Sequence, residues 1–447
     1  MSKKAALHNL GCKVNAYELD AMQQMLEADG YEIVPFAPGA DVYVINTCTV
    51  TNIADRKSRQ MLHKAKKMNP HAVVVATGCY VQAAGETLKK DEAIDIVIGN
   101  NKKQDLISIL KGYWNHEEKE EYHIIDINHT DEYEELKIEK TAEHTRAYIK
   151  IQDGCNQFCT YCIIPFARGR VRSRSKEEIM KEIQVLAEAG YQEIVLTGIH
   201  LSSFGVDFAS FEKNEDYPYG HGLIELIENI EHAEGIKRVR LGSLEPRIIT
   251  ESFAKRLAKC TKICPHFHLS MQSGCDETLK RMNRRYNTAQ FKAGCDILRK
   301  YFDTPALTTD IIVGFPGETE EEFALTQKYV EQIDFYETHI FKYSRRKGTK
   351  ADLMENQIAD AVKTERSQCL IELGAKSKLA YANNFEDQEV EVLFEEKIVA
   401  DGKEYWQGHT RHYVRALLQS EQDLTNILMT CQVDHIDEDG TIFCKFH

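Results

Sequence analysis

Apolar runs alternate with stretches of helical periodicity over the first 110 residues. The apolar runs predict buried strands at residues 5–10, 42–45 and 73–77. Asn15, with Glu18 three positions later, predicts the cap of a helix whose apolar positions continue to about residue 28. Strands that alternate with helices in this way are typical of a parallel sheet. We therefore expect an N-terminal α/β domain over residues 1–110.

The same alternation continues with more strands from residue 146 onward. Strands are expected at residues 148–152, 193–197, 238–241, 266–269, 308–312 and 336–341. Helical stretches such as residues 176–189 and 319–333 separate them. Six parallel strands with helical crossovers predict an open α/β barrel, whose chemistry lies at the carboxyl ends of the strands and whose open side would suit a large substrate.

Two further segments depart from this pattern. Acidic clusters at residues 117–121 and 131–135 surround a short apolar piece and predict a linker or an extension of the sheet edge. A helix expected at residues 358–384 precedes short alternating runs that predict a small β-barrel, for which contact with nucleic acid or a purely structural role both remain open. The candidates for nucleic-acid contact are Trp406, Arg411, Tyr413 and Arg415. The expected domains cover residues 1–110, 111–145 (the linker), 146–373 (the open barrel with its trailing helix) and 374–447.

The composition is that of an ordinary soluble protein, with 43% hydrophobic and 28% charged residues among 447. We expect a cytoplasmic protein without a membrane partner, since no apolar run has the length of a membrane span and the N-terminus does not resemble a signal peptide. We also expect a monomer. The net charge of -14 argues against broad, non-specific binding of nucleic acid. RNA would have to bind local basic segments, for each of which a solvated charged face is the alternative: residues 57–67, 168–174 and 342–350.

Three cysteines, Cys155, Cys159 and Cys162, fall within eight residues directly after the first barrel strand. This spacing allows three thiolates to bind three irons of a cubane cluster and leaves the fourth iron open to a substrate. A zinc site or buried core cysteines are the alternatives. Structural zinc requires a fourth ligand nearby, and no Cys or His follows within the usual few residues.

Cys12, Cys48 and Cys79 each lie just past a predicted strand. Parallel strands end at the same edge of a sheet, so three separate loops would bring these thiols together. The alternative is three unrelated buried residues. Thirteen cysteines in a chain of this kind indicate metal binding or catalysis rather than disulfides. The others are expected to be packing residues: Cys260, Cys264, Cys275, Cys295, Cys369, Cys431 and Cys444.

The cysteine octet resembles the signature of the radical S-adenosylmethionine (SAM) enzymes, and the whole chain resembles the methylthiotransferase family. The supporting stretches are residues 10–15, 46–48, 77–79, 153–156 and 309–318, together with a C-terminal segment similar to a TRAM domain. The resemblance implies one 4Fe-4S cluster on Cys155, Cys159 and Cys162, whose open iron binds SAM. It implies a second 4Fe-4S cluster on the three N-terminal cysteines.

Further contacts to SAM are expected around the octet and at the strand ends. Aromatic residues before the third cysteine lie against the adenine in the enzymes that the octet resembles, and Tyr161 fits this position. Gly198 would let the backbone approach the amino group of the methionine closely. The full set of expected SAM contacts is Tyr161, Thr197, Gly198, Glu245, Gln272 and Asp310.

The resemblance implies that SAM is cleaved to methionine and a 5′-deoxyadenosyl radical, which removes hydrogen from C2 of a modified adenosine. The second cluster would present sulfur, and a second SAM would supply the methyl group. Acid and base groups alone could not remove the hydrogen from C2, because an aryl C–H offers no acidic proton. Residues 10–15 and 241–246 resemble most the branch that acts on N6-threonylcarbamoyladenosine beside the anticodon of tRNA.

Three alternatives remain at this stage. The same chemistry could act on N6-isopentenyladenosine in tRNA or on an aspartate of a ribosomal protein. An acidic C-terminal segment, with twice as many acidic as basic residues from residue 374 onward, would suit docking on a basic protein. A non-enzymatic iron-sulfur carrier that binds RNA is the third, and it would not consume SAM. The expected partners are tRNA and an electron donor that resembles flavodoxin or ferredoxin.

Overall fold

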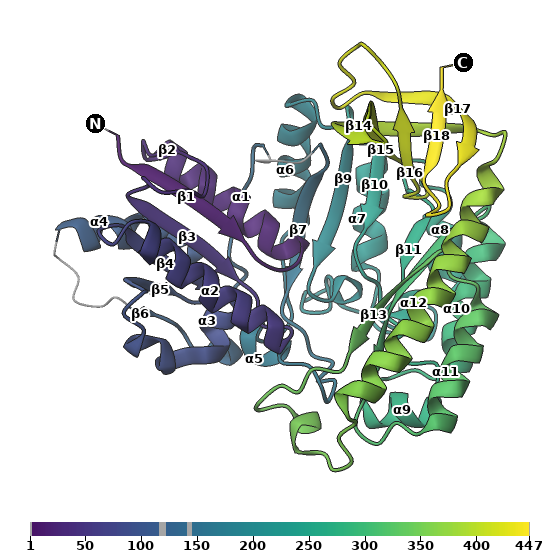
Figure 1. Ribbon diagram of the computed structural model, residues 1–447, viewed down its shortest axis with the longest axis horizontal. Helices are drawn as coiled ribbons and strands as arrows, with labels where there is room; N and C mark the ends of the chain where they lie inside the picture. Colours follow the sequence, from purple (N-terminus) through teal and green to yellow (C-terminus); the bar gives the residue numbers. More distant parts are fainter. Residues whose placement is uncertain (1, 116–121, 141–144, 447) are drawn as a thin grey trace.

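A parallel sheet of six strands forms the N-terminal part of the chain in the computed structural model, which describes residues 2–115, 122–140 and 145–446 (Figure 1). Its strands, in spatial order, are β2 (Glu32–Ile33), β1 (Lys4–Asn9), β3 (Val42–Thr47), β4 (Val73–Gly78), β5 (Ile96–Ile98) and β6 (Tyr122–His123). The helices are α1 (Lys13–Ala28), α2 (Asn52–Met68), α3 (Cys79–Ala84) and α4 (Leu106–Asn115), with the short 3₁₀ helices η1 (Gly85–Lys90) and η2 (Lys103–Asp105). The predicted N-terminal α/β fold is confirmed. β6 lies in the segment expected as a linker or edge extension, while the acidic run at residues 117–121 is outside the described residues.

The two central strands, β3 and β4, are buried along their whole length. Successive side chains of a strand point to opposite faces, so both faces of this sheet must be covered. Ile45 of β3 packs in one cluster with Leu62 of α2, whereas Val44 packs on the other face with Met22 of α1. Helices on both faces explain why these strands read as continuous apolar runs.

Asn15 does not cap the first helix, and this prediction is wrong. The helix α1 begins at Lys13, with Cys12 at the N-cap position. Asn15 is buried inside the first turn, where its Nδ2 donates hydrogen bonds to the carbonyls of Leu10 at 2.8 Å and Thr47 at 3.0 Å. Its side chain therefore joins the loops that follow β1 and β3.

Six parallel strands form the central barrel, as predicted. They are β7 (Ala147–Asp153), β9 (Glu193–Gly198), β10 (Arg238–Leu241), β11 (His266–His268), β12 (Ala306–Val313) and β13 (Glu337–Lys342). Isolated parallel bridges, among them Leu244 with Leu269, join β10 to β11. The barrel wall ends at β8 (Arg172–Ser173), antiparallel to β7, on one side and at β13 on the other, so the predicted open barrel is confirmed.

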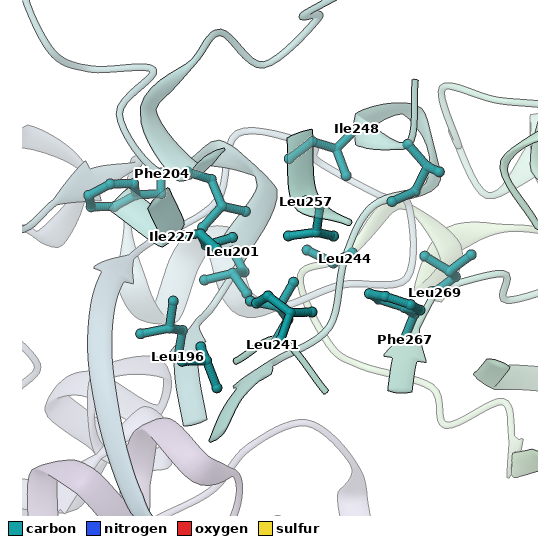
Figure 2. Close-up of a cluster of buried hydrophobic side chains, with 14 of the residues drawn as sticks. Leu196, Leu201, Phe204, Ile227, Leu241, Leu244, Ile248, Leu257, Phe267 and Leu269 are labelled. Carbon is teal, nitrogen blue, oxygen red and sulfur yellow. The ribbon is translucent and has the colours of Figure 1, made fainter. Parts of the chain in front are cut away.

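The crossover segments of the barrel hold its helices. They are α5 (Ile164–Arg168), α6 (Lys176–Glu188), α7 (Gly222–Glu231), α8 (Glu251–Leu257), α9 (Asp276–Arg281), α10 (Thr288–Tyr301) and α11 (Glu320–Ile333), with η3 (Ile127–His129) before the barrel, and η4 (Leu201–Ser203) and η5 (Pro246–Ile248) within it. Figure 2 shows part of the core, in which Leu196 of β9, Leu241 of β10 and Phe267 of β11 lie near Ile227 of α7 and Leu257 of α8. This apolar core fixes the strand ends that carry the polar residues of the site.

A long helix and a closed five-stranded barrel complete the chain. The helix α12 (Asp360–Ala382) follows η6 (Lys350–Leu353), lies against β13 and is continued by η7 (Asn383–Phe385). The barrel has the strand order β14 (Glu389–Ala400), β15 (Lys403–Thr410), β16 (Arg415–Leu418), β18 (Ile442–Lys445) and β17 (Leu428–Ile436). The predicted C-terminal β-barrel is confirmed. The boundary placed after residue 373 falls within α12, and the domain limits remain predictions.

Candidate functional site

The octet that holds Cys155, Cys159 and Cys162 forms the loop directly after β7, and all three thiols are half-buried. Gly154 begins this loop with a φ of 72°, and a Cβ at this position would lie 1.8 Å from the carbonyl oxygen of Arg170. Only glycine fits such a close approach of two backbone segments. The Cys155 amide donates a hydrogen bond to the Gly169 carbonyl at 3.0 Å, which holds the octet against the end of α5.

Two cationic side chains reach the octet: Arg170 lies over the ring of Phe158, 4.6 Å from its centroid, and Arg284 contacts a cysteine. Arg284 donates from Nη1 to Cys159 Sγ at 3.2 Å and from Nη2 to the carbonyl of Ser270 at 3.0 Å. Burial raises the pKa of the Cys155 thiol to about 11, and burial together with the neighbouring thiols raises that of Cys162. Thiols in this environment become thiolates when a metal replaces their protons.

Cys12, Cys48 and Cys79 follow β1, β3 and β4, as predicted, at one edge of the first sheet. They lie close together: a Cβ on Gly11 would be 3.3 Å from Cys48 Sγ, and burial raises the pKa of Cys48 to about 11, with Cys79 and Cys12 adding to the effect. Gly78, with a φ of 96°, has no room for a side chain beside Asn46. The three loops therefore form one cluster of thiols.

No three His, Cys, Asp or Glu side chains among the described residues converge on a position for a single metal ion. A zinc ion needs ligands that converge on one atom, whereas the thiolates of a cubane cluster each bind a different iron. Binding of a cubane cluster by each triad stays a prediction.

A buried ionic network joins the two cysteine loops. Arg168 at the end of α5 donates from Nε to Cys79 Sγ at 3.1 Å, and its Nη1 lies 2.6 Å from Glu18 of α1 and 3.1 Å from Asp153. Asp153 lies two residues before Cys155. Lys150 and Lys103 also pair with Glu18, at 2.8 and 3.3 Å. Burial alone would raise the pKa of Glu18, but these cations hold it well below its usual range.

Glu245, one of the expected SAM contacts, lies in a buried polar cluster. It accepts hydrogen bonds from the Tyr219 hydroxyl at 2.7 Å and from Arg247 Nε at 2.8 Å. Gln157, inside the octet, donates to the same Tyr219 hydroxyl at 3.4 Å. Glu245 thus contacts the cysteine loop through Tyr219, a residue that no pattern in the sequence marks.

Thr197 and Gly198 end β9 on the same side of the barrel. A Cβ on Gly198 would lie 2.9 Å from Gln152 Oε1, which itself accepts a hydrogen bond from the His200 amide. The Nε2 atom of His200 is buried and has no hydrogen-bond partner among the described residues, and burial lowers the pKa of this histidine to about 4. His200 is therefore a neutral, unsatisfied polar group at this strand end.

The remaining expected contacts come from the other half of the barrel. Gln272 has a φ of 71°, and its backbone N–H donates to the backbone carbonyl of Asp310 at 2.8 Å. The side-chain carboxylate of Asp310 lies 3.3 Å from His268 Nε2. Tyr161 packs with its ring centroid 6.4 Å from that of Phe315. Arg284 links this half to the octet through Cys159 and Ser270, so both halves of the barrel contact the cysteine loop.

Models of two protein families match this chain. The first is described as "Radical SAM superfamily" and matches residues 149–330, and the second as "Uncharacterized protein family UPF0004" and matches residues 4–99. Threonylcarbamoyladenosine tRNA methylthiotransferase MtaB of Bacillus subtilis (strain 168) is 40% identical over 96% of this chain and 93% of that protein. MtaB of Aquifex aeolicus (strain VF5) is 37% identical over 87% and 92%, respectively. The chain belongs to the radical SAM methylthiotransferase family.

Other methylthiotransferases and solved structures are also similar. A tRNA-2-methylthio-N(6)-dimethylallyladenosine synthase of Clostridium botulinum (strain Langeland / NCTC 10281 / Type F) is 35% identical over 85% of this chain and 84% of that protein. The radical SAM methyltransferase TsrM of Kitasatospora setae superposes with a TM-score of 0.57 at 16% identity, over 78% of this chain and 77% of that one, which supports the fold alone. A helix long and apolar enough to cross a membrane was not found in the described part of this methylthiotransferase.

For the arginine run at residues 168–174, the sequence offered two interpretations, an RNA-binding segment or a solvated charged face. Neither describes three of its four arginines in this methylthiotransferase. Arg168, Arg172 and Arg174 are fully buried and pair with carboxylates of α1, β7 and α6. Arg170 is exposed. A run of like charges looks solvated in sequence, but buried carboxylates on other elements neutralise it here.

The candidate RNA contacts of the C-terminal barrel are mostly occupied by the protein itself. Trp406 is 5% exposed and packs in the core of the barrel. Arg411 donates hydrogen bonds to two carbonyls of the loop before β11, and Tyr413 stacks on His409 with ring centroids 4.5 Å apart. Arg415 is half-buried and donates to Gln407 at 2.7 Å. Arg411 and Tyr413, which also stacks on His266 of β11, therefore help to dock the barrel. Trp406 is part of the barrel core, and contact of the three partly exposed residues with nucleic acid stays a prediction.

Proposed function

We propose that this protein methylthiolates C2 of N6-threonylcarbamoyladenosine at position 37, beside the anticodon of tRNA, to give 2-methylthio-N6-threonylcarbamoyladenosine. The observation that carries the proposal is the nearly full-length similarity to MtaB, at 40% identity over 96% of the chain. Two triads of cysteines on facing loops, joined through the buried Arg168, support the same conclusion. We expect the protein to act as a monomer with an electron donor similar to flavodoxin or ferredoxin.

The residues around both triads fit iron-sulfur clusters. Cys155, Cys159 and Cys162 would hold one 4Fe-4S cluster, and the three N-terminal cysteines would hold the second. Arg284 and Arg168 each donate a hydrogen bond to a sulfur, and cations of this kind stabilise the negative charge of thiolate ligands. Bound there, the clusters would supply one-electron cleavage of SAM and an iron to which the transferred sulfur binds.

The polar residues at the strand ends would bind and orient SAM. Glu245 is held by Tyr219 and Arg247, so its carboxylate is fixed in place before any ligand arrives. The backbone at Gly198 and the free Nε2 of His200 lie at the neighbouring strand end. Walls of this kind exclude water and thiols from a radical. The proposed contacts are Tyr161, Thr197, Gly198, Glu245, Gln272 and Asp310.

Replacing Tyr161 by alanine should weaken SAM binding about tenfold, because a stacked aromatic ring contributes on the order of 1–3 kcal/mol. Equilibrium dialysis of SAM against the anaerobic, cluster-loaded protein measures this change. Tyr161→Phe keeps the ring and should bind SAM nearly as well as the wild type. Equal affinities for the alanine variant and the wild type would remove Tyr161 from the site.

The experiment that tests the function is mass spectrometry of tRNA nucleosides from cells with and without this gene. Specific loss of 2-methylthio-N6-threonylcarbamoyladenosine is expected. Loss of the isopentenyl counterpart instead would assign the other tRNA branch. If both nucleosides were unchanged, the aspartate of a ribosomal protein would become the substrate to test, and a protein that forms no 5′-deoxyadenosine from SAM would be a carrier.

A further inference from the structure

The segment after β13 contacts both cysteine loops. Arg346 is buried, and its guanidinium donates to the Thr49 hydroxyl at 2.7 Å, one residue after Cys48. The Ala351 amide donates to the Thr160 carbonyl at 2.9 Å, inside the cysteine octet. Figure 1 shows this segment reaching from the barrel toward α5 and the N-terminal sheet. Residues 344–353 therefore lie at the boundary between the two triads.

Arg346 also fixes this segment to the start of α2. Its Nη1 lies 2.8 Å from Asn52 Oδ1 and 2.7 Å from the Asp55 carboxylate. The Asn52 side chain donates in turn to the Arg345 carbonyl at 2.9 Å. These contacts hold the start of α2, just before the basic segment at residues 57–67, against the basic segment at residues 342–350. The two segments are therefore neighbours, although they lie almost 300 residues apart in the chain.

Four exposed cations lie on this combined surface: Arg56, Lys57, Lys347 and Lys350. Within the described parts of the chain, none of the four forms an ion pair, whereas the nearby Arg345 is neutralised by Asp352. Two large apolar side chains are exposed beside them, Ile53 at 59% and Leu353 at 83%. We name these six residues the cationic rim.

We propose that the cationic rim binds the loop of an RNA hairpin, with the four cations on its phosphates and Ile53 and Leu353 against its unstacked bases. This inference rests on the proposed function and assigns the surface through which the tRNA reaches the site. Unpaired cations next to exposed apolar side chains match single-stranded RNA, which offers phosphates and bases together. A basic protein partner would be repelled by the same four charges.

The position of the rim argues for the same occupant. A nucleotide that reacts between the two triads must have its neighbouring phosphates near the edge of both loops, where Arg346 and Ala351 anchor the segment. The other basic features offer fewer free cations, because the arginine run exposes only Arg170 and Arg411 is used to dock the C-terminal barrel. The net charge of -14 then confines RNA to this local surface.

The test is fluorescence anisotropy of a labelled RNA hairpin with an anticodon stem and loop, titrated with the cluster-loaded full-length protein at several salt concentrations. The double variant Lys347→Glu and Lys350→Glu should weaken RNA binding about tenfold or more. It should also reduce the slope of log affinity against log salt concentration by about two, because two phosphate contacts are lost. Leu353→Ser should weaken binding without changing the salt dependence. Iron content and thermal unfolding verify that each variant is folded and loaded.

The matched control is Lys255→Glu with Lys259→Glu, an equal charge change on exposed lysines at and just after α8. This control should bind RNA like the wild type. If the rim variant and the control bound equally, the rim proposal would be overturned while the proposed function stood. If the wild type neither bound the hairpin nor modified tRNA, the proposed function itself would fail. Tighter binding of a basic peptide by the wild type than by the rim variant would equally overturn an RNA-binding rim.

Discussion

Cys48→Ala protein is expected to produce no methylthiolated nucleoside. Cys48 belongs with Cys12 and Cys79 to the thiol cluster at the end of the first sheet, and an iron-sulfur cluster with only two thiolate ligands there would be lost or unstable. The octet after β7 is untouched by this change. Cleavage of SAM to 5′-deoxyadenosine should therefore continue, and the iron content should fall to about half. Nucleoside mass spectrometry, product analysis and iron determination measure the three quantities.

Cys260→Ala is the matched control for this prediction. Cys260 is also a buried thiol, but it packs in the apolar core of the open barrel and lies in neither triad. Its removal should cost about 1 kcal/mol of stability and leave both the iron content and the product unchanged. Full methylthiolation by the Cys48→Ala protein would contradict the assignment of two clusters.

Arg168→Met is expected to lower the free energy of unfolding by about 3 kcal/mol, the lower end of the range for breaking a buried ion pair. The change leaves Glu18 and Asp153 buried without their shared guanidinium, although Lys150 still contacts both carboxylates. Arg168 also donates a hydrogen bond to Cys79 Sγ, so the iron bound by the three N-terminal cysteines should become more labile in this variant. Urea unfolding and the rate of iron loss to a chelator measure the two effects.

Arg170→Met provides the control two positions away. Arg170 is exposed, and within the described part of the chain its guanidinium contacts only the ring of Phe158, by a cation–π interaction, so its replacement should change the free energy of unfolding by no more than about 1 kcal/mol. Equal stability of the two variants would mean that the buried network contributes nothing to the docking of the N-terminal sheet on the barrel. A stable Arg168→Met protein that keeps its iron would contradict the role given to Arg168.

Much of the fold could be predicted because its signals are local. The parallel strands β3 and β4 are short apolar runs between helical stretches, and helices cover them on both sides. The helix α11 even carries its own start signal, since Thr319 and Glu322 form a capping box. Each of these features depends on residues a few positions apart, so it can be identified without knowledge of the tertiary contacts.

The residues that complete the site could not be predicted, because their partners are distant in the chain. Tyr219 contacts both Glu245 and Gln157, yet it lies in an irregular segment without any motif. Arg284 reaches Cys159 from 125 residues away. Asn15 was expected to cap a helix, the commonest use of this side chain at such a position, but it binds the Thr47 carbonyl across the sheet edge instead.

The sequence by itself determined the α/β class, the open barrel, the C-terminal β-barrel and the two cysteine triads, since periodicity and ligand spacing are properties of short segments. Only the tertiary structure decided what the charged residues do. Arg168 and Arg174 look solvated in sequence but are buried against carboxylates of other elements, whereas Lys347 and Lys350 remain exposed beside α2. Whether a charge faces solvent or a buried partner depends on which distant elements pack together, and no local pattern contains that information.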